Sequence, residues 1–386
     1  MRILIIPSWY PTPSNPVNGI FVQQQAGALS KTHDLRVLYL DMLPRGERRK
    51  PRRYLNKRKD YIEEIVEVPN RPLIWQFTYL WYMLRAFINL RRKFMPDIIH
   101  CHVAVPAGWA VALLRRLFGV PVILTEHTSE FDSWRKRPGQ RWMAAVAYGS
   151  ADAVLPVSEG QRFQLQQNFR CRNRVLVVSN MVDTDRFTQT PFPPTAEGYH
   201  LLFVGLMETG QKGVPILLQA ISQIKQSGHP LELSLHLDLV GGGKLLPEYQ
   251  TLARQIALDD MVTFHGYQPP AVVAQMLRES HALVLPSHFE SQGVVVIEAL
   301  ASGRPVVSTR CGGPEFMVNS TNGLIVEPGN ATELAAAIVN LLTHLDRYDP
   351  ASIASNAVSL YSYNAVVSTL SEIYDSVQNH SVRPHR

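Results

Sequence analysis

The 386-residue sequence has few cysteines and no long apolar run. Its three cysteines, Cys101, Cys171 and Cys311, exclude a disulfide-stapled scaffold and fit a reducing compartment. No stretch of about 18 uncharged apolar residues occurs, so no transmembrane helix is predicted. The first apolar run ends before Pro7 and is too short for the hydrophobic region of a signal peptide. We therefore expect a cytoplasmic protein.

Charge is also scarce, and it is unevenly divided. Only 18% of the residues are charged and 46% are hydrophobic, which is typical of a folded globular protein. Residues 1–190 hold 28 Lys and Arg against 15 Asp and Glu (+13), whereas residues 191–386 hold 10 against 17 (−7). This asymmetry indicates two domains with different partners. The basic half could meet nucleic acid, an anionic membrane or an anionic substrate.

The positive charge is densest in Arg45–Lys59, which has nine basic residues and one acidic residue. Two interpretations stay open: a solvated loop, or a patch for an anionic membrane or acceptor. The segment Pro72–Phe94 follows, rich in aromatic residues and basic at its end. It is either a core helix or an interfacial helix. Both interpretations hold if only one of its faces is buried.

Short apolar runs separated by helix-length segments recur along the chain. Such continuous runs are typical of parallel strands buried on both faces, and their alternation with helices indicates doubly wound sheets. The first half offers six runs: Arg2–Ile6, Leu35–Leu40, Asp97–His100, Pro121–Thr125, Asp152–Pro156 and Arg174–Val178. The second half offers another six: His200–Val204, Leu233–Val240, Met261–His265, His281–Leu285, Pro305–Thr309 and Gly323–Val326. We predict an α/β protein with two Rossmann-like domains.

The domain boundary is expected in Gln189–Tyr199, where three prolines and a glycine interrupt any periodicity. This gives a first domain over residues 1–190 and a second over residues 191–364. The last helix, about Ala365–Val377, follows the final strand, and no later strand remains for it to connect to. We expect residues 365–386 to return to the first domain.

The segment Ser287–Thr309 concentrates side chains suited to ligand binding. Glu290 and Glu298 are eight positions apart, with Gly293 between them and a helix-compatible run from Val294. Exposed N–H groups at a helix start bind phosphate, and carboxylates accept hydrogen bonds from sugar hydroxyls. The pair could hold a ribose and a second sugar on either side of a diphosphate. The spacing alone equally suits two unrelated surface glutamates.

The surrounding sequence favours the ligand-binding interpretation. The segment resembles the E-x7-E signature of the GT4 family, the retaining glycosyltransferases of GT-B fold. Further similarity extends over nearly the whole chain: Pro7–Gln25, Ile123–Phe131, Val157–Gly160, Val178–Phe187, Phe203–Gly213, Val240–Gly243, Phe264–Tyr267 and Cys311–Phe316. The combination is specific for the family, although no single piece is. The resemblance implies two doubly wound domains facing across a cleft, the first for the acceptor and the second for the donor.

The same resemblance implies the site residues. Glu298 matches the glutamate that binds ribose, and Glu290 matches the one that contacts the donor sugar. Lys212 matches the lysine that neutralises the leaving diphosphate, and His127 matches the histidine that faces the donor sugar. The remaining donor contacts would come from main-chain groups of the first loop and the helix start, and from the base pocket: Gly19, Ser291, Gln292, Gly293, Val294, His265 and Gly266.

One position departs from the family pattern. The family usually has arginine after the Gly205 position, where this chain has Leu206. Leucine cannot pair with phosphate. Either Lys212 and helix dipoles suffice, or another cation such as Arg310 or a first-domain arginine substitutes, or the protein binds donor poorly.

No metal or other cofactor is expected. Asp183-Thr184-Asp185 has the form of a metal motif, but it lies in a stretch that resembles an interdomain turn of the family. His100-Cys101-His102 lacks a second ligand pair. Gly241–Gly243 lacks the full dinucleotide-binding pattern.

The resemblance implies a retaining hexosyltransferase. It would move sugar from a UDP- or GDP-sugar to a hydroxyl of a saccharide or lipid-linked acceptor, in cell-surface polysaccharide synthesis. An anionic membrane, at the inner face of the cell membrane, is a better candidate for peripheral contact than nucleic acid. The alternatives are a nucleotide-sugar epimerase of GT-B fold and a noncatalytic carbohydrate-binding protein.

Overall fold

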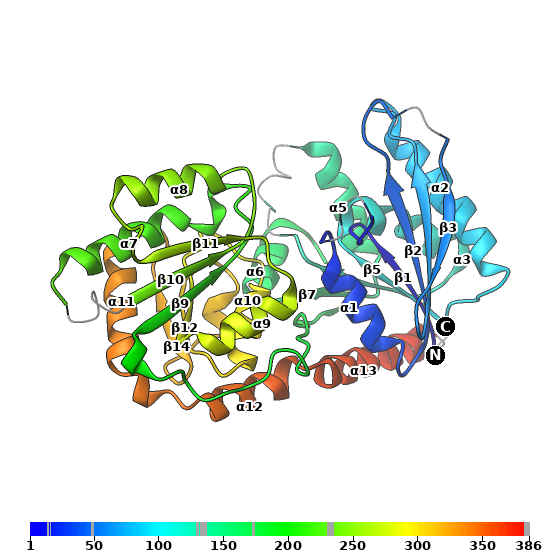
Figure 1. The fold of residues 1–386 in the computed structure, drawn as a ribbon. Coiled ribbons are helices and arrows are strands. Elements are labelled where there is room, and N and C mark those ends of the chain that lie inside the picture. The colour runs from blue at the N-terminus through cyan, green and yellow to red at the C-terminus, as the bar shows by residue number, and fades with distance from the viewer. Residues whose placement is uncertain are drawn as a thin grey trace. The chain divides into compact units, whose positions relative to one another are not determined.

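The computed structural model describes residues 1–13, 15, 17–47, 50–128, 131, 137–171, 174–229 and 235–381. They form two compact units (Figure 1). The first holds Met1–Val157, Gln161–Ser179 and Val366–Arg386, and the second holds Ser158–Gly160 and Asn180–Ala365. The chain enters the second unit at Asn180, ahead of the proline-rich segment expected as the boundary. A hydrogen bond helps to explain the earlier crossing, because the Val182 N–H donates to the Tyr361 carbonyl of the second unit at 2.8 Å.

The first unit is built on an eight-stranded sheet of order β3-β4-β2-β1-β5-β6-β7-β8. Every neighbouring pair is parallel except β3 and β4. The strands are β1 (Arg2–Pro7), β2 (Asp34–Met42), β3 (Arg53–Lys57), β4 (Ile62–Val68), β5 (Ile98–His102), β6 (Val122–Glu126), β7 (Ala153–Pro156) and β8 (Arg174–Val175). The prediction of six strands is therefore wrong for this unit. It missed β3 and β4 because charged residues interrupt the apolar pattern of both strands.

The basic run Arg45–Lys59 is partly structured, so a solvated loop does not describe all of it. Strand β3 lies within the run and pairs with β4, which buries its glutamates. Arg58 Nε donates to Glu63 Oε1 at 2.8 Å, and Arg53 Nε lies 2.9 Å from Glu64 Oε1. Part of the positive charge thus neutralises buried carboxylates. Positions 48 and 49 of the run lie outside the described residues.

Helix α2 (Trp75–Arg91) fills the predicted segment Pro72–Phe94 and has two different faces. One face is buried and confirms the interpretation as a core helix: Tyr79, Met83, Ala86, Phe87 and Leu90. The opposite face leaves Phe77 74% exposed and Trp81 53% exposed. The other helices of this unit are α1 (Ile20–Leu29), α3 (Trp109–Phe118), α5 (Pro138–Ser150) and α6 (Glu159–Asn168).

The last helix, α13 (Tyr363–Ser381), belongs to the first unit from Val366 onward. Its Tyr374 hydroxyl lies 2.7 Å from His100 Nδ1, and its Ser371 hydroxyl lies 2.9 Å from His33 Nε2. These bonds tie the C-terminal helix to β5 and to the loop that precedes β2. None of the described helices combines the length and the apolar character that crossing a bilayer requires.

The second unit contains all six predicted strands in one parallel sheet of order β11-β10-β9-β12-β13-β14. They are β9 (Tyr199–Val204), β10 (Leu235–Val240), β11 (Val262–Gly266), β12 (Ala282–Leu285), β13 (Val306–Thr309) and β14 (Gly323–Val326). The helices are α7 (Val214–Gln226), α8 (Leu246–Gln255), α9 (Pro270–Glu279), α10 (Val294–Ala301), α11 (Ala331–Thr343) and α12 (Pro350–Tyr361).

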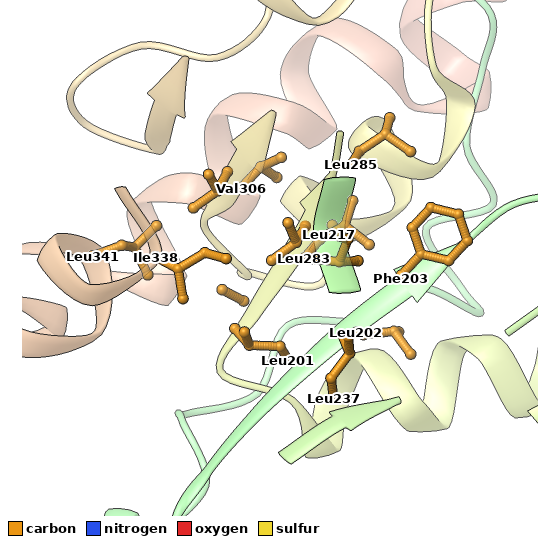
Figure 2. Packing of buried hydrophobic residues seen from close by; sticks show 14 of the residues in the cluster. Leu201, Leu202, Phe203, Leu217, Leu237, Leu283, Leu285, Val306, Ile338 and Leu341 are labelled. Carbon is orange, nitrogen blue, oxygen red and sulfur yellow. The ribbon is translucent and has the colours of Figure 1, made fainter. Parts of the chain in front are cut away.

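The core of the second unit explains why its strands are easy to predict. Figure 2 shows strand residues such as Leu201, Leu283 and Val306 together with Leu217 of α7 and Ile338 of α11. Consecutive residues of β12, from Ala282 to Leu285, are all fully buried. A parallel sheet covered on both faces requires such continuous apolar runs.

Candidate active site

Two loops meet at the centre of the second sheet. Strand β9 comes first in this unit, and it lies between β10 and β12. In open α/β sheets, ligands bind at the carboxyl ends of the strands where the order reverses in this way. The loop after β9 carries Lys212, and the loop after β12 carries Glu290. Although 78 positions separate them, the sheet order places these residues at one edge.

Lys212 and Glu290 form a close ion pair. Lys212 Nζ lies 2.6 Å from Glu290 Oε1, and the Ser287 hydroxyl donates to the same oxygen at 2.6 Å. Charge-assisted bonds of this kind are short and strong. The Glu290 side chain is 8% exposed and that of Lys212 is 25% exposed, so ligand can reach the lysine. Ser287 opens the predicted segment, yet its contact with Glu290 was not predicted.

A glycine allows these two loops to approach each other. Gly213, directly after Lys212, has a φ of 66°, and a Cβ there would lie 2.0 Å from the Pro286 carbonyl oxygen. Any other residue would place its Cβ against this backbone oxygen, and its own backbone would have an unfavourable positive φ. Gly213 therefore secures the placement of Lys212 beside Glu290.

The turn after Glu290 leads directly into helix α10. Gly293 precedes the helix with a φ of 85°, and Val294 is its first residue. The Gln292 side chain accepts hydrogen bonds from the Asn180 backbone at 2.9 Å and from the Asn180 amide at 2.8 Å. Ser291 lies in the sequence between Glu290 and Gln292, whose side chains are both held by hydrogen bonds. The first N–H groups of a helix have no partner within it, so this turn presents donors suited to a phosphate.

Glu298 lies within α10 in a different environment from Glu290. Burial raises the pKa of its carboxyl to about 8, although the nearby Arg186 guanidinium acts in the opposite direction. At neutral pH the folded protein thus holds Glu298 largely protonated. Glu290 lies in the loop between β12 and α10, and Glu298 lies within α10. In the described residues the two side chains share no hydrogen-bond partner.

In the first unit, Gly19 occupies a position that only glycine fits. It precedes α1 with a φ of 68°, and a Cβ would lie 2.3 Å from the Trp9 carbonyl oxygen. Its loop follows β1, the strand at which the order of the first sheet reverses. The loop therefore runs along the carboxyl edge, where ligands bind in such sheets. Positions 14 and 16 of the predicted motif lie outside the described residues.

His127 follows β6 and is buried. Its Nε2 lies 3.0 Å from His102 Nδ1, and its ring centre lies 4.3 Å from that of Phe21. Burial lowers the pKa of His127 to about 3, so the ring is neutral at physiological pH. His100 stacks on His102 at 4.3 Å and is itself held by Tyr374 and Thr125. Across the described part of the chain, no three His, Cys, Asp or Glu residues are arranged to hold a metal ion.

Two family models match successive parts of this chain. The model for group 1 glycosyl transferases matches residues 198–344, and that for Glycosyltransferase Family 4 matches residues 19–186. The uncharacterized glycosyltransferase MJ1178 of Methanocaldococcus jannaschii is 30% identical over 285 residues, which are 72% of this chain and 76% of that protein. The chain belongs to the GT4 family of GT-B glycosyltransferases. It is therefore a glycosyltransferase enzyme.

Solved structures share the GT-B fold of this GT4 enzyme. Anabaena HepE, in a crystal structure with UDP-glucose, has a TM-score of 0.75 at 18% identity, over 97% of this chain and 100% of that one. The apo form of the lipopolysaccharide outer core galactosyltransferase WaaB has a TM-score of 0.74 at 19% identity, over 97% and 99%. These likenesses confirm the predicted fold of two parallel-sheet α/β domains.

The predicted base-pocket residues of this GT4 chain lie on β11. The His265 ring does not join the Lys212–Glu290 pair, because its Nε2 lies 2.6 Å from Asp238 Oδ1 on β10. Both side chains line a cavity of about 920 Å³ whose wall includes α9 residues. The Gly266 carbonyl accepts a hydrogen bond from the Gly241 N–H at 2.8 Å. Gly266 thus connects the end of β11 to the loop that follows β10.

The position where GT4 members usually have arginine is at the surface. Leu206 is 52% exposed, so a larger side chain fits there. Arg310, considered as a substitute cation, has its Nε 2.9 Å from Glu327 Oε1, with both side chains well exposed. Lys212 is the cation that contacts Glu290 in the described residues.

Sequence reasoning missed one residue that shapes the GT4 histidine loop. The fully buried Glu126 carboxylate accepts hydrogen bonds from the backbone of His127 at 2.9 Å and of Thr128 at 2.7 Å. It also accepts from the Ala104 backbone at 3.0 Å and the Tyr148 hydroxyl at 2.6 Å. The available signal was an acidic residue at the end of an apolar strand. Glu126 sets the backbone conformation that presents His127.

Proposed function

We propose that this chain transfers a hexosyl group from a UDP- or GDP-sugar to a hydroxyl of a saccharide or lipid-linked acceptor, with retention of anomeric configuration. The Lys212–Glu290 pair beside the start of α10 carries the proposal. A cation and backbone N–H groups together suit a diphosphate, and the carboxylates suit sugar hydroxyls. The donor screen described below would identify the preferred nucleotide base and donor sugar.

The chemical demand on this site is charge stabilisation. Breaking the anomeric C–O bond releases a nucleoside diphosphate, whose negative charge grows in the transition state. Preorganised donors aimed at that charge lower the barrier. Lys212 would bind the departing diphosphate, and the N–H groups at the start of α10 would complete its coordination without a metal ion. The departing phosphate would take the proton of the acceptor hydroxyl on the same face, so configuration is retained.

The roles of the remaining residues follow from their chemistry. Glu298 would accept hydrogen bonds from the ribose hydroxyls, and Glu290 would contact the donor sugar. His127 stays neutral, so it can bond a sugar hydroxyl without introducing a positive charge. Gly19 would let the first loop approach the diphosphate. Gly266 would border the base, whereas the His265 ring is engaged by Asp238.

Relatives support the substrate classes in this proposal. HepE was crystallised with UDP-glucose, which supports a nucleotide-sugar donor. WaaB is described as a lipopolysaccharide galactosyltransferase, which supports a saccharide acceptor in cell-surface polysaccharide synthesis. The basic first unit favours an acceptor of negative charge.

A donor screen with variants tests the proposed function. The protein is incubated with UDP- and GDP-sugars, and nucleotide release is measured with and without saccharide acceptors. Glu290→Ala and Lys212→Ala are expected to abolish release. Lys225→Ala is the matched control, because Lys225 pairs with the carboxylate of Asp260 at 2.7 Å on the surface. Full activity of both site variants contradicts the assignment.

The product distinguishes the proposal from its alternatives. NMR of the new glycosidic bond is expected to show the anomeric configuration of the donor. An inverted bond contradicts the retaining mechanism. Conversion of the donor into an epimer without sugar transfer indicates an epimerase, and saccharide binding without turnover indicates a noncatalytic protein.

Peripheral membrane contact is a further part of the proposal. The outer side of α2 and the residues before it expose apolar side chains, with Leu73 94% exposed and Phe77 74% exposed. Arg71 and Arg92 flank this surface in the sequence. Exposed apolar groups with nearby cations suit the inner, anionic face of a cell membrane.

Vesicle co-sedimentation tests this contact. Phosphatidylglycerol vesicles are expected to bind the protein better than phosphatidylcholine vesicles at low salt. The double variant Leu73→Ser/Phe77→Ser should lose the binding. Leu360→Ser is the control, because Leu360 is 53% exposed on α12. Equal binding to both vesicle types contradicts membrane contact.

A further inference from the structure

A cavity rich in arginine is lined by residues at the edge strand β3 and by residues of helix α2. Its volume is about 290 Å³. Residues from the β3 side and from α2 supply its polar and aromatic wall: Arg52, Arg53, Trp81, Tyr82, Arg85 and Asn89. It belongs entirely to the first unit and is separate from the residues matched to the donor.

The residues that line this cavity carry a net positive charge. Three arginines and one glutamate, Glu67, line it. Arg53 is oriented by Glu64, with 2.9 Å between Nε and Oε1, yet its side chain is 46% exposed. The Arg85 guanidinium carbon lies 5.2 Å from the centre of the Trp81 ring. Both cations are therefore held near fixed positions and still reach solvent.

A second cavity of about 630 Å³ shares Arg52, Arg53 and Glu67 with the first. Thr12 and Asp41 add polar groups to its wall. Thr12 follows β1, Asp41 is near the end of β2, and Glu67 is near the end of β4. The two cavities are therefore neighbours, with Arg52, Arg53 and Glu67 lining both, along the carboxyl edge of the first sheet. Gly19 and His127 follow strands β1 and β6 at this same edge.

We infer that the arginine cavity binds an oxyanion group, a carboxylate or a phosphate, carried by a saccharide acceptor. Arginine presents a planar set of donors that matches both groups. Trp81 and Tyr82 offer apolar ring surface next to those donors, as ligand pockets commonly do. The inference rests on the proposed function, because it names the acceptor of that reaction.

The neighbouring cavity favours a saccharide over a lipid headgroup. A phosphate headgroup needs only the cations, whereas Thr12 and Asp41 of the second cavity and the shared Glu67 add further polar groups beside them. Hydroxyl and carboxylate oxygens of this kind accept hydrogen bonds from sugar hydroxyls. The exposed Leu73 and Phe77, which suit a lipid surface, do not line either cavity.

Calorimetric titration without donor tests the inference. The probes are two matched pairs: trigalacturonic acid with its methyl ester, and maltotriose phosphate with maltotriose. At least one charged member is expected to bind at least tenfold more tightly than its neutral partner. Arg85→Gln should remove that preference, whereas Arg92→Gln, an exposed arginine at the end of the same helix, should retain it. The preferred pair distinguishes carboxylate from phosphate.

Other outcomes overturn the inference. Equal binding of charged and neutral probes excludes an oxyanion site, and so does an unchanged preference in Arg85→Gln. If phosphatidylglycerol vesicles bind through Arg85 and no saccharide does, the cavity is a lipid site instead. Thermal melting confirms that each variant is folded.

The titration and the donor screen fail independently. A chain that binds the charged saccharide but releases no nucleotide contradicts the proposed function and keeps the cavity assignment. A chain that transfers sugar but binds charged and neutral saccharides equally supports the proposed function and contradicts the cavity assignment.

Discussion

The glutamates near the two sheets are held in two different ways. In the first unit, Glu126 accepts four hydrogen bonds from protein groups, and Glu63 is bonded by Tyr10, Gln23, Arg58 and Tyr61. In the second unit, Glu290 accepts two bonds on one oxygen, and Glu298 is half-buried with a raised pKa. A carboxylate with a full set of protein donors stabilises the fold. One with an incomplete set suits a ligand.

The largest effect is expected for Glu126→Ala. The change leaves the buried Ala104 N–H and Tyr148 hydroxyl without their carboxylate partner, and each buried unsatisfied group is costly. The free energy of unfolding should fall by about 3 kcal/mol or more in urea denaturation. Glu327→Ala, at an exposed ion pair, should change it by no more than about 0.5 kcal/mol. Equal losses of unfolding free energy in both variants would show that the four donors to Glu126 do not make it a structural residue.

The opposite result is expected for Glu290→Gln. The amide keeps the shape of the side chain, so stability should change by less than about 1 kcal/mol. Nucleotide release should fall about 100-fold, because the amide no longer balances Lys212 or contacts the donor sugar as a carboxylate. Steady-state kinetics and thermal melting together check this separation. Lower stability with unchanged kinetics would place Glu290 with Glu126 as a structural residue.

Gly19→Ala extends the comparison from side chains to backbone. The new Cβ would lie 2.3 Å from the Trp9 carbonyl oxygen at a positive φ, so the loop must shift at a cost of about 1–3 kcal/mol. Gly27→Ala in the same helix α1 meets no atom within 4 Å and should be neutral or slightly stabilising. Urea denaturation of both variants measures the difference. A neutral Gly19→Ala would show that the close approach is dispensable.

The pH dependence tests the environment of Glu298. Its pKa in the folded protein, about 8, lies above the usual 4.5 of a glutamate, so its neutral form favours folding below pH 4.5. This stabilisation is lost as pH rises through 8. In the proposed role of Glu298, ribose hydroxyls would donate to the charged form, so donor KM should fall roughly tenfold from pH 7 to pH 9. Glu298→Gln should flatten this profile. A flat wild-type profile would contradict the role in ribose binding.

The smallest effect is expected for Leu206→Arg. Leu206 is exposed, so an arginine fits without repacking and adds the cation that the family usually has there. A solvated cation contributes modestly, so donor KM should fall about two- to fivefold. Leu360→Arg on α12 controls for added charge. An unchanged KM would show that Lys212 and α10 already satisfy the diphosphate.

Prediction from the sequence succeeded where the strand residues form apolar runs. All six strands of the second sheet were predicted, although the edge strand β11 is only partly buried. Strands β3 and β4 were missed because charged residues, among them the buried Glu63, Glu64 and Glu67, interrupt their apolar pattern. A pattern search interprets such glutamates as solvated. Only pairing with arginine, tyrosine and backbone donors makes their burial possible.

The candidate site shows the same division between sequence and structure. The spacing of Glu290 and Glu298, with the resemblance around it, was sufficient to predict the GT4 family, and it predicts the residue types of the candidate site. The contact between Lys212 and Glu290, across 78 positions, depends on β9 lying beside β12. Local sequence determines which segments form strands and helices. Only tertiary structure decides which strand ends are neighbours, and thus which carboxylates receive protein donors and which remain available to a ligand.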